Sequence, residues 1–389
     1  MSARERQKKR VVMTVANEFT TDYRVHREAK ALVDEGYDVT LFCVWKKGLA
    51  RAEETDGIHV RRVLDGYLRL PLTRQVRKIR RVWWKALVQA QGDIYHAHDR
   101  DTLDYTAKIA RRRRVPFVYD SHEYWPDKNQ YTSNTGSLRD RLSEFLWTWK
   151  EGRNARRATR MIMTSPGHAS GLVKRHRVAA PTLVRNIPEY QRGTDTSYLR
   201  NKFHLSDDDL ILAYVGNIQR NRGLEEVIAS LARLPEHVHF IAIGYGPFRK
   251  ELEGNIPKQL KERVHFHDTI PYRDIVPVLY SADIGMAPFQ ANCYSHRHVL
   301  PNKIFEYMMS ELPIAVSNLP DMREIIEKTG TGLFFEPNSL RSIAQTVKQL
   351  MDQPELRERM RKNARQATEK TYRWDVEKHQ LLNLYRSLS

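Results

Sequence analysis

The segment HVLPNKIFEYMMSELPIAVSNLPDMREI, residues 298–325, decides the fold of this chain more than any other stretch. Pro301, Asn302 and Lys303 are expected to begin a short helix, because proline fits a first helical turn, where its missing N–H costs nothing. A β-strand over 314–317 and another helix are expected to follow. This order is typical of a parallel sheet covered by helices.

The start of that first helix has the chemistry of an anion site. Free backbone N–H groups and a partial positive charge suit a phosphate. Lys303 and Glu306 lie three residues apart and share a helix face. The cation can meet phosphates, while the carboxylate one turn on can accept hydrogen bonds from a diol. The segment therefore predicts a sugar-nucleotide site. The alternative is an exposed ion pair in front of an ordinary amphipathic helix.

Outward from this segment, apolar strand patterns alternate with helical patterns along the whole chain. The first series has strands expected at 11–15, 39–44, 93–96, 115–119, 161–165 and 182–185. The second series has strands expected at 211–215, 238–243, 264–267, 283–286, 314–317 and 332–335. Two such series predict an α/β protein with two Rossmann-like, doubly wound parallel sheets.

The domain boundaries are expected near residue 190 and near residue 372. Residues 1–190 would form an acceptor-side domain and residues 191–372 a donor-binding domain, with the polar stretch 193–209 as a linker region. The terminal helix, within 373–389, is expected to pack back on the first domain. Ligands of such sheets bind beyond the carboxyl ends of the strands, so the expected site is the cleft between the domains.

The composition limits the function classes. The chain has 389 residues and a net charge of +18, which suits nucleic acid, an anionic membrane or a phosphorylated substrate. No run of ~18 apolar residues predicts a transmembrane helix, and no apolar segment of secretory length follows the charged N-terminus. Cys43 and Cys293 are interpreted as free thiols in a reducing compartment. We therefore expect a cytoplasmic protein, peripheral on the inner face of the membrane.

The membrane part of this expectation rests on basic clusters at 74–85, 111–114 and 153–160. Residues 74–90 are expected to form a helix, with Trp83 and Leu87 on its apolar stripe and Trp84 off the centre of that stripe. Basic residues beside tryptophans suit an interfacial helix on anionic lipid. The alternative is a helix that faces the core and has a solvated basic back.

Polar residues follow two strands of the first half. His122 comes directly after the expected strand 115–119, a position that favours function over structure. His96, His98 and His122 have acidic neighbours, but their spacing matches no standard zinc pattern, and we predict no metal site.

A loop of the second half carries Gly216, Arg220 and Arg222 between a strand and a helix that starts at Gly223. Gly216 allows a sharp turn. The guanidinium of Arg222 can bind a diphosphate in bidentate fashion, and with Lys303 it would form a cationic pair about one phosphate group. The alternative is a solvent-exposed loop arginine.

Taken together, these motifs resemble the large retaining family of group-1 glycosyltransferases, which has the two-Rossmann-domain GT-B fold. The likeness covers nearly the whole chain and keeps the family's order. The segments that carry it are DYRVHREAKALVDEGYDVTLF, DIYHAHD, VYDSHEYW, YVGNIQRNRGLEEVIASL, IAIGYGPFRKELE, VHFHDTIPYRDIVPVLYSADIGMAP, LPNKIFEYMMSELPIAVSNLPDMREII and YRWDVEKHQLLNLYRSL.

The resemblance implies roles for individual residues. His122 matches the acceptor-domain histidine that lies by the donor sugar and pyrophosphate. Glu306 matches the second glutamate of the family's Glu-x7-Glu motif, which holds the donor ribose. Arg222 and Lys303 match pyrophosphate-binding positions. His122 and Glu306 are thus the predicted catalytic residues, and the predicted donor-binding residues are Gly216, Arg220, Arg222, His298, Pro301, Asn302, Lys303 and Glu306.

Two positions depart from the family pattern. His298 stands where the first glutamate of the motif would fall, so the usual carboxylate for the donor sugar is missing. Asn217 stands where an arginine commonly follows the strand-end glycine, which leaves Arg220 as a substitute. Both departures bear on the identity of the sugar more than on the type of reaction.

The implied reaction is transfer from a nucleoside-diphosphate sugar to a glycan or lipid-linked acceptor, with retention of configuration and without a metal or other cofactor. Arg222, Lys303 and the helix start would stabilise charge on the leaving diphosphate. The alternatives are a basic nucleic-acid-binding protein, which the absence of a nucleic-acid motif opposes, and a GT-B relative that is an epimerase, a phosphorylase or inactive.

Overall fold

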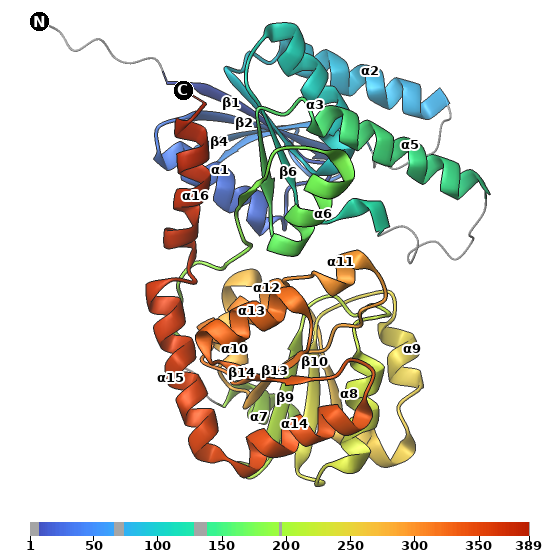
Figure 1. The fold of residues 1–389 in the computed structure, drawn as a ribbon, viewed down its shortest axis with the longest axis vertical. Helices are drawn as coiled ribbons and strands as arrows, with labels where there is room; N and C mark the ends of the chain where they lie inside the picture. Colours follow the sequence, from blue (N-terminus) through green and yellow to red (C-terminus); the bar gives the residue numbers. More distant parts are fainter. Residues whose placement is uncertain (1–7, 66–73, 128–137, 194–196, 389) are drawn as a thin grey trace, which may run out of the picture. The chain divides into compact units, whose positions relative to one another are not determined.

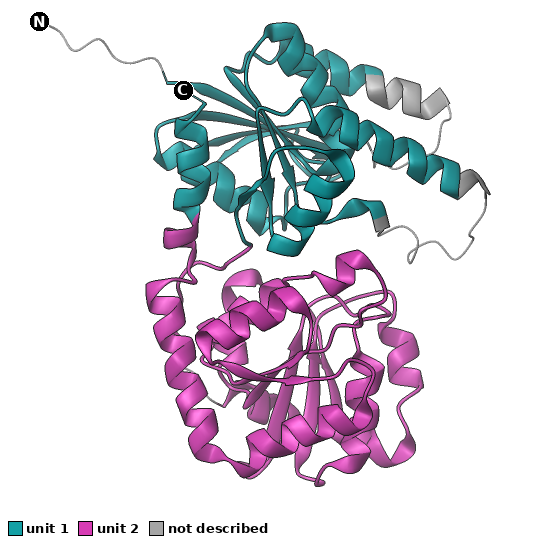
Figure 2. Cartoon of the chain, viewed as in Figure 1, with its two compact units in different colours: residues 1–185, 378–389 teal, residues 186–377 magenta. Residues whose placement is uncertain are grey.

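The chain forms two compact units, which Figure 2 colours separately. The computed structural model describes residues 8–65, 74–127, 138–193 and 197–388. Unit 1 comprises residues 1–185 and 378–389, and unit 2 comprises residues 186–377. The sequence-based boundaries lie at 190 and 372, so both differ from this division by a few residues.

Unit 1 is built on an eight-stranded sheet in the order β3-β4-β2-β1-β5-β6-β7-β8. All neighbouring strands in it are parallel except β3 and β4, which are antiparallel. The strands are β1 (Arg10–Thr14), β2 (Asp38–Trp45), β3 (Ala52–Thr55), β4 (Ile58–Asp65), β5 (Ile94–His98), β6 (Phe117–Ser121), β7 (Arg160–Met163) and β8 (Thr182–Leu183).

The β3–β4 hairpin is absent from the sequence-based prediction, which had only parallel strands in this half. Its first strand, AEET, is exposed along its whole length and has no apolar residue besides alanine. A polar edge strand gives no hydrophobic periodicity, so the pattern could not reveal it.

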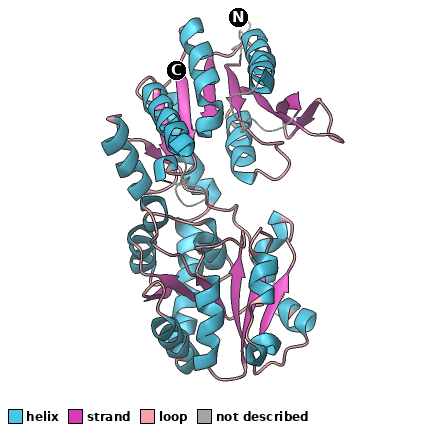
Figure 3. Ribbon diagram, turned by 90° about the vertical axis from the view of Figure 1, so that its right-hand side faces the viewer, coloured by secondary structure: helices cyan, strands magenta, loops and turns pink. Residues whose placement is uncertain are grey.

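Helices cover both faces of the unit 1 sheet (Figure 3). On one face, side chains of α2, α3, α5 and α6 form one apolar cluster with the central strands; Trp83, Leu87 and Leu103 are fully buried in it. Strands buried on both faces are continuous apolar runs, as expected of parallel sheets. The helices are α1 (Tyr23–Asp34), α2 (Arg74–Gln89), α3 (Asp99–Arg113), α5 (Leu138–Ala155), α6 (Pro166–His176) and the 3-10 turn η1 (Trp125–Asp127).

Unit 2 contains a six-stranded, wholly parallel sheet in the order β11-β10-β9-β12-β13-β14 (Figure 1). The strands are β9 (Leu210–Val215), β10 (Val238–Ile243), β11 (Val264–His267), β12 (Ile284–Ala287), β13 (Ile314–Ser317) and β14 (Gly332–Phe335). The helices are α7 (Tyr198–Phe203), α8 (Leu224–Ser230), η2 (Leu231–Arg233), α9 (Arg249–Gly254), η3 (Lys258–Arg263), η4 (Tyr272–Asp274), α10 (Ile275–Leu279), α11 (Tyr294–Arg297), α12 (Asn302–Met309), α13 (Pro320–Thr329), α14 (Leu340–Asp352) and α15 (Pro354–Lys370).

The predicted linker at 193–209 is wrong for its described part, residues 197–209. These residues include α7, whose Leu199 is fully buried in a unit 2 core cluster and whose Tyr198 packs against that cluster. Polar composition concealed the two apolar residues that anchor the segment.

The last helix, α16 (Trp374–Arg386), begins in unit 2 and ends in unit 1. Trp374 N–H donates to the Pro188 carbonyl at one end. At the other end Arg386 pairs with Glu35, and the Tyr385 hydroxyl lies 2.7 Å from His96 Nδ1.

The strand orders fix where each unit can bind a ligand. The order reverses between β1 and β5 in unit 1 and between β9 and β12 in unit 2. Ligands of open α/β sheets bind at the carboxyl ends of the strands beside such a reversal. The residues after β5 and β6 in unit 1, and those after β9 and β12 in unit 2, are therefore the expected ligand-binding positions.

Candidate functional site

In unit 2, the turn after β9 passes close to the side chain of Lys303. Gly216 has a φ of +129°, and a Cβ built on it would lie 3.3 Å from Lys303 Nζ. Gly244, after β10, has a φ of +143°, and a Cβ there would lie 2.1 Å from the Gly216 carbonyl oxygen. Only glycine meets both demands at these positions. The two turns thus bring bare backbone close to the lysine ammonium group.

Lys303 is a buried cation supported by aromatic rings. Its Nζ lies 3.7 Å from the centroid of the Tyr214 ring and 5.2 Å from that of Phe289. Among the described residues, no acceptor lies within hydrogen-bond or ion-pair distance of this Nζ. Burial lowers the pKa of Lys303 well below its usual value, Arg222 lowers it further, and Glu306 opposes the change. An anion bound here would supply the missing counter-charge.

Arg222 approaches the same place. Its guanidinium carbon lies 4.6 Å from the centroid of Phe289, so both cations border one buried ring. Within the parts of the chain that the structure describes, Arg222 makes no ion pair with a carboxylate. The structure therefore brings together the two residues predicted to bind a diphosphate. Arg220 lies elsewhere: it pairs with Glu251 and stacks on Phe248 at 4.6 Å.

Helix α12 begins as the sequence suggests, with one difference. Pro301 is the N-cap in extended conformation, and Asn302 is the first helical residue. Lys303 and Glu306 are both buried, and they do not approach within the 4.0 Å of an ion pair. The alternative of an exposed surface ion pair is therefore wrong.

His298 caps the C-terminus of α11 and faces a carboxylate. Its Nδ1 lies 3.1 Å from Oδ1 of Asp321, which is buried in the first turn of α13. The Tyr294 ring packs on the imidazole at 4.5 Å. A carboxylate thus stands next to the position where the family pattern has its first glutamate.

In unit 1, β5 and β6 extend further than predicted. His96 and His98 lie within β5 and are fully buried. His96 was predicted in this strand, whereas His98 was predicted in the loop after it. Asp120 and Ser121 likewise end β6. The polar residues shortened the predicted strands, because a central parallel strand is usually apolar throughout.

His122 follows β6 and is held between two carboxylates. Its Nε2 lies 3.0 Å from Asp120 Oδ2, and its Nδ1 lies 3.3 Å from Asp99 Oδ2. Its backbone N–H donates to Asp99 Oδ1 at 3.0 Å. Asp99 has a left-handed φ of +60°, a strained conformation of the kind found at functional sites.

These contacts set the charge of the ring. Burial lowers the pKa of His122, but the Asp99 and Asp120 carboxylates outweigh it and raise the pKa to about 10. At neutral pH the ring is therefore an imidazolium. Both ring nitrogens already face carboxylates, so the ring could donate to a sugar hydroxyl only by giving up one of these contacts.

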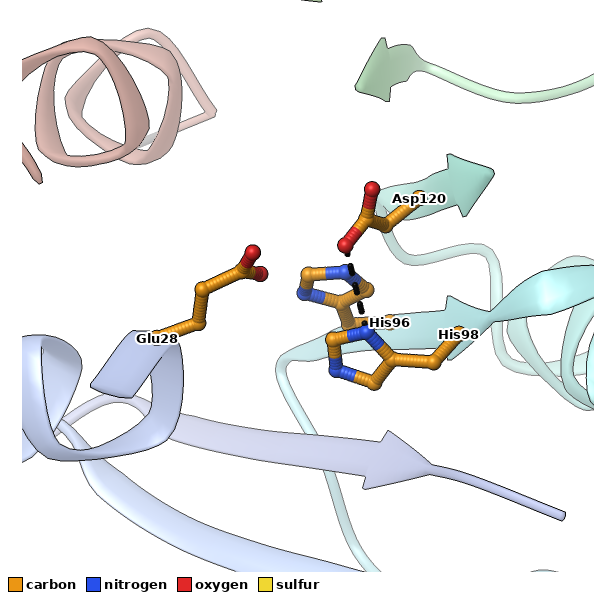
Figure 4. Close-up of side chains that lie close together, drawn as sticks. All are labelled: Glu28, His96, His98 and Asp120. Atoms are coloured by element: carbon orange, nitrogen blue, oxygen red, sulfur yellow. Dashed lines mark hydrogen bonds and ion pairs between the residues drawn. The ribbon is translucent and has the colours of Figure 1, made fainter. Parts of the chain in front are cut away.

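Behind His122 lies a buried polar network, shown in Figure 4 with Glu28, His96, His98 and Asp120. His98 Nδ1 lies 3.2 Å from Asp120 Oδ2. Arg24 Nη2 lies 3.0 Å from Asp120 Oδ1 and 2.9 Å from Glu28 Oε1. Burial raises the pKa of Glu28 to about 8 despite Arg24, so this carboxyl is largely protonated at neutral pH.

The four residues of Figure 4 have the chemistry of metal ligands, and ligand atoms of all four lie within 4.8 Å of one another. This set shares His96 and His98, but not His122, with the trio considered from the sequence. A divalent cation would be repelled by Arg24, which already contacts both Glu28 and Asp120, and by the His122 imidazolium. The group therefore fits a polar network better than a metal centre; that no metal is needed stays a prediction.

Sequence reasoning missed several residues of these sites. In unit 2 it missed Tyr214 and Phe289, whose rings contact Lys303 and Arg222. In unit 1 it missed Arg24, Glu28 and Asp99, which lie around the histidines. Phe289 lies two residues after the end of β12, so strand-end position could have indicated it. Arg24 and Glu28 lie inside a helix and give no comparable signal.

Comparison with known proteins identifies the family. A model described as Glycosyl transferase 4-like domain matches residues 21–187, and one described as Glycosyl transferases group 1 matches residues 195–367. The chain therefore belongs to the group-1 glycosyltransferases.

Individual proteins show the same likeness. The chain is 26% identical over 319 residues to the alpha-D-kanosaminyltransferase of Streptomyces kanamyceticus, covering 78% of this chain and 80% of that protein. Sucrose-phosphate synthase from Thermosynechococcus elongatus superposes with a TM-score of 0.80 at 18% identity, over 98% of this chain and 99% of that one. Anabaena Alr3699/HepE, solved in complex with UDP-glucose, superposes with a TM-score of 0.74 at 14% identity, over 97% and 99% of the two chains.

These findings confirm the predicted fold class and the glycosyltransferase activity. At these identities the solved structures show the GT-B fold alone. The family favours the enzyme over the nucleic-acid-binding alternative. No helix in the described ranges is long and apolar enough to cross a membrane.

Proposed function

We propose that the protein transfers a sugar from a nucleoside-diphosphate sugar to a glycan or lipid-linked acceptor, with retention of configuration. One observation carries the donor class: Lys303 and Arg222 border the same buried ring and have no carboxylate partner among the described residues. A buried cation without a counter-ion is costly unless a ligand supplies one. A diphosphate has the charge that this pair lacks.

The chemistry follows from where charge develops. When the bond between the anomeric carbon and the diphosphate oxygen breaks, its electron pair goes to the diphosphate and the sugar becomes cationic. Lys303, Arg222 and the N–H groups at the start of α12 are proposed to stabilise the leaving diphosphate without proton transfer. Glu306 is proposed to hold the ribose diol. No resident metal or other cofactor is assigned to this step.

In unit 1, His122 is proposed to interact with the donor sugar. Its imidazolium character means that it does not act as a general base at neutral pH. A hydrogen bond from the ring to a sugar hydroxyl, exchanged for the contact with Asp99, is the role that its surroundings support. Asp99 is the more exposed of the two carboxylates, so it is the partner that a substrate can replace.

The relatives support a nucleotide-sugar donor and leave the sugar open. HepE was solved with UDP-glucose, and the kanosaminyltransferase is named for a different sugar. We propose that the protein binds its donor through a nucleoside diphosphate, such as uridine diphosphate.

The test has two stages. Calorimetry with UDP, GDP and ADP should find one nucleoside diphosphate that binds at micromolar concentration. Mass spectrometry of reactions that contain the matching nucleotide sugars and extracted lipid-linked acceptors should then show a product heavier by one sugar residue, and NMR of its anomeric proton should show the donor's configuration. Binding of none of the three nucleotides would refute the donor assignment, and an inverted product would refute retention.

A further inference from the structure

Helix α5 of unit 1 presents an apolar stripe to solvent. Its side chains Leu142, Phe145, Leu146 and Trp149 are 60, 65, 41 and 49% exposed. Their spacing, i, i+3, i+4 and i+7, places them on one face of the helix. A surface helix of a soluble protein normally turns such a stripe toward the core. Here the stripe is exposed to solvent. The helix that carries it lies on the outside of unit 1 (Figure 1).

The described acidic side chains of the same helix, Glu144 and Glu151, turn inward. Glu144 accepts a hydrogen bond from Arg100 at 2.9 Å, and buried Glu151 accepts one from the Tyr119 hydroxyl at 2.7 Å. In the part of α5 whose side chains are described, residues 141–155, every charged residue on the exposed face is cationic: Arg141 and Arg153. The Arg153 guanidinium lies 5.5 Å from the Trp149 ring. The exposed face is therefore apolar and positively charged.

Neighbouring helices add to this charge. Helix α3 packs against both α2 and α5, and its C-terminal end carries exposed arginines. The described part of α2 adds exposed Arg81, Val82 and Lys85. Among the described side chains of these two helices and the turn after α3, the exposed basic residues are Arg81, Lys85, Lys108, Arg111, Arg112 and Arg114.

The structure also corrects the sequence-based choice of membrane contact. The predicted contact combined the basic clusters at 74–85, 111–114 and 153–160 with Trp84, but Trp84 is half-buried and packs against the unit 1 core cluster. The side chains of residues 74–80, part of the basic cluster on α2, lie outside the described ones.

We infer that the outward face of α5 docks on an anionic lipid bilayer. Leucine, phenylalanine and tryptophan at helical spacing can enter the boundary between headgroups and acyl chains, while the arginines meet lipid phosphates. A second copy of the chain fits less well, because two such faces would bring their arginines together, with no acid among the described side chains of that face. Nucleic acid would bind the arginines but would leave the leucines and Phe145 without a partner. The inference does not depend on the proposed function.

Vesicle flotation of the full-length protein tests it. At low salt the protein should float with vesicles of phosphatidylglycerol and phosphatidylcholine and should stay down with phosphatidylcholine alone. The double variant Phe145→Ser/Trp149→Ser should lower the partition coefficient at least tenfold, and Arg141→Gln/Arg153→Gln should lower it about threefold. Tyr245→Ser changes an aromatic residue that is equally open to solvent but lies in unit 2, so its flotation should match that of the wild type.

The outcomes separate the alternatives. Wild-type protein that ignores the anionic vesicles, or a Phe145→Ser/Trp149→Ser variant that floats like the wild type, would overturn the inference. If light scattering instead showed a wild-type dimer that this variant converts to a monomer, the face would be a protein interface and the lipid assignment would fail. Nucleoside-diphosphate binding should be the same in the wild type and in the two α5 variants, so failure here leaves the proposed function intact.

Discussion

The two units place positive charge in opposite surroundings. In unit 1, Arg24 and His122 both face the carboxylate of Asp120. In unit 2, Lys303 and Arg222 face the rings of Tyr214 and Phe289 instead. The cations of unit 1 have a carboxylate partner within the fold. The cations of unit 2 contact aromatic rings, which attract a cation without neutralising it. The comparison distinguishes cations whose counter-ion is part of the fold from cations that are ready for an anionic ligand.

The largest expected effect is on the stability of unit 1. Asp120→Asn would leave Arg24 buried without its main counter-ion. Removing one partner of a buried ion pair costs ~3–5 kcal/mol. Urea denaturation should show this loss, and restoring neutrality with Arg24→Met in the same chain should recover part of it. Unchanged stability of the single variant would show that the network does not hold the fold.

The next largest effect concerns activity in unit 2, with no cost in stability. Lys303→Met and Arg222→Ala should each weaken transition-state stabilisation by ~2–4 kcal/mol, which is roughly 30- to 1,000-fold in turnover. The melting temperature of Lys303→Met should equal or exceed that of the wild type, because the variant loses an unpaired buried cation. Normal turnover in both variants would remove the diphosphate assignment. A clear loss of stability would contradict the contrast with unit 1.

His122 should make the free energy of unfolding depend on pH. Its pKa is raised to about 10 in the folded protein, against ~6.5 in an unfolded chain. The stabilisation is therefore complete below pH ~6.5 and is lost as the pH rises through the folded value. Between pH 7 and 10 the unfolding free energy of the wild type should fall relative to that of His122→Gln, by ~1 kcal/mol or more. Urea denaturation at several pH values measures this.

Other groups around the ring must be considered in that experiment. Those that face it are Asp99, Asp120, Arg24, Glu28, His96 and His98. Glu28, with its pKa raised to about 8, also favours the folded state at lower pH. Asp99→Asn should make the unfolding free energy depend less steeply on pH, because it weakens the His122 contribution that His122→Gln removes entirely. Parallel curves for the wild type and His122→Gln would contradict the imidazolium assignment.

The smallest expected effect concerns Glu306. Glu306→Gln should weaken nucleoside-diphosphate binding about fivefold, or ~1 kcal/mol, through weaker hydrogen bonds to the ribose. Calorimetry measures it. The control is Glu251→Gln, which removes the exposed partner of Arg220 and should leave affinity unchanged. Equal affinities in the two variants would leave Glu306 without a role in binding the ribose.

Much of the fold could be predicted from the sequence, because buried parallel strands are continuous apolar runs. The bounds of β10, β11, β13 and β14 agree residue for residue with the predicted strands. The prediction failed where polar residues lie in strands or apolar ones in polar segments, as with His98 in β5 and Leu199 in α7. Position after a strand indicated Arg222 and His122, and the expected helix start indicated Lys303. Neither could indicate Phe145 or Trp149, since periodicity shows that a helix has two faces but not which one meets the core.

The path of α16 has a consequence for the order in which the molecule is made. Unit 2 is one continuous stretch, whereas unit 1 also needs residues 378–389. Tyr385, the hydrogen-bond partner of His96 Nδ1, leaves the ribosome only after all of unit 2 has been synthesised. Until then a histidine in the middle of the unit 1 sheet lacks a bond that it has in the finished protein. Although its strands are made first, unit 1 is completed only after unit 2, when residues 378–389 have been synthesised.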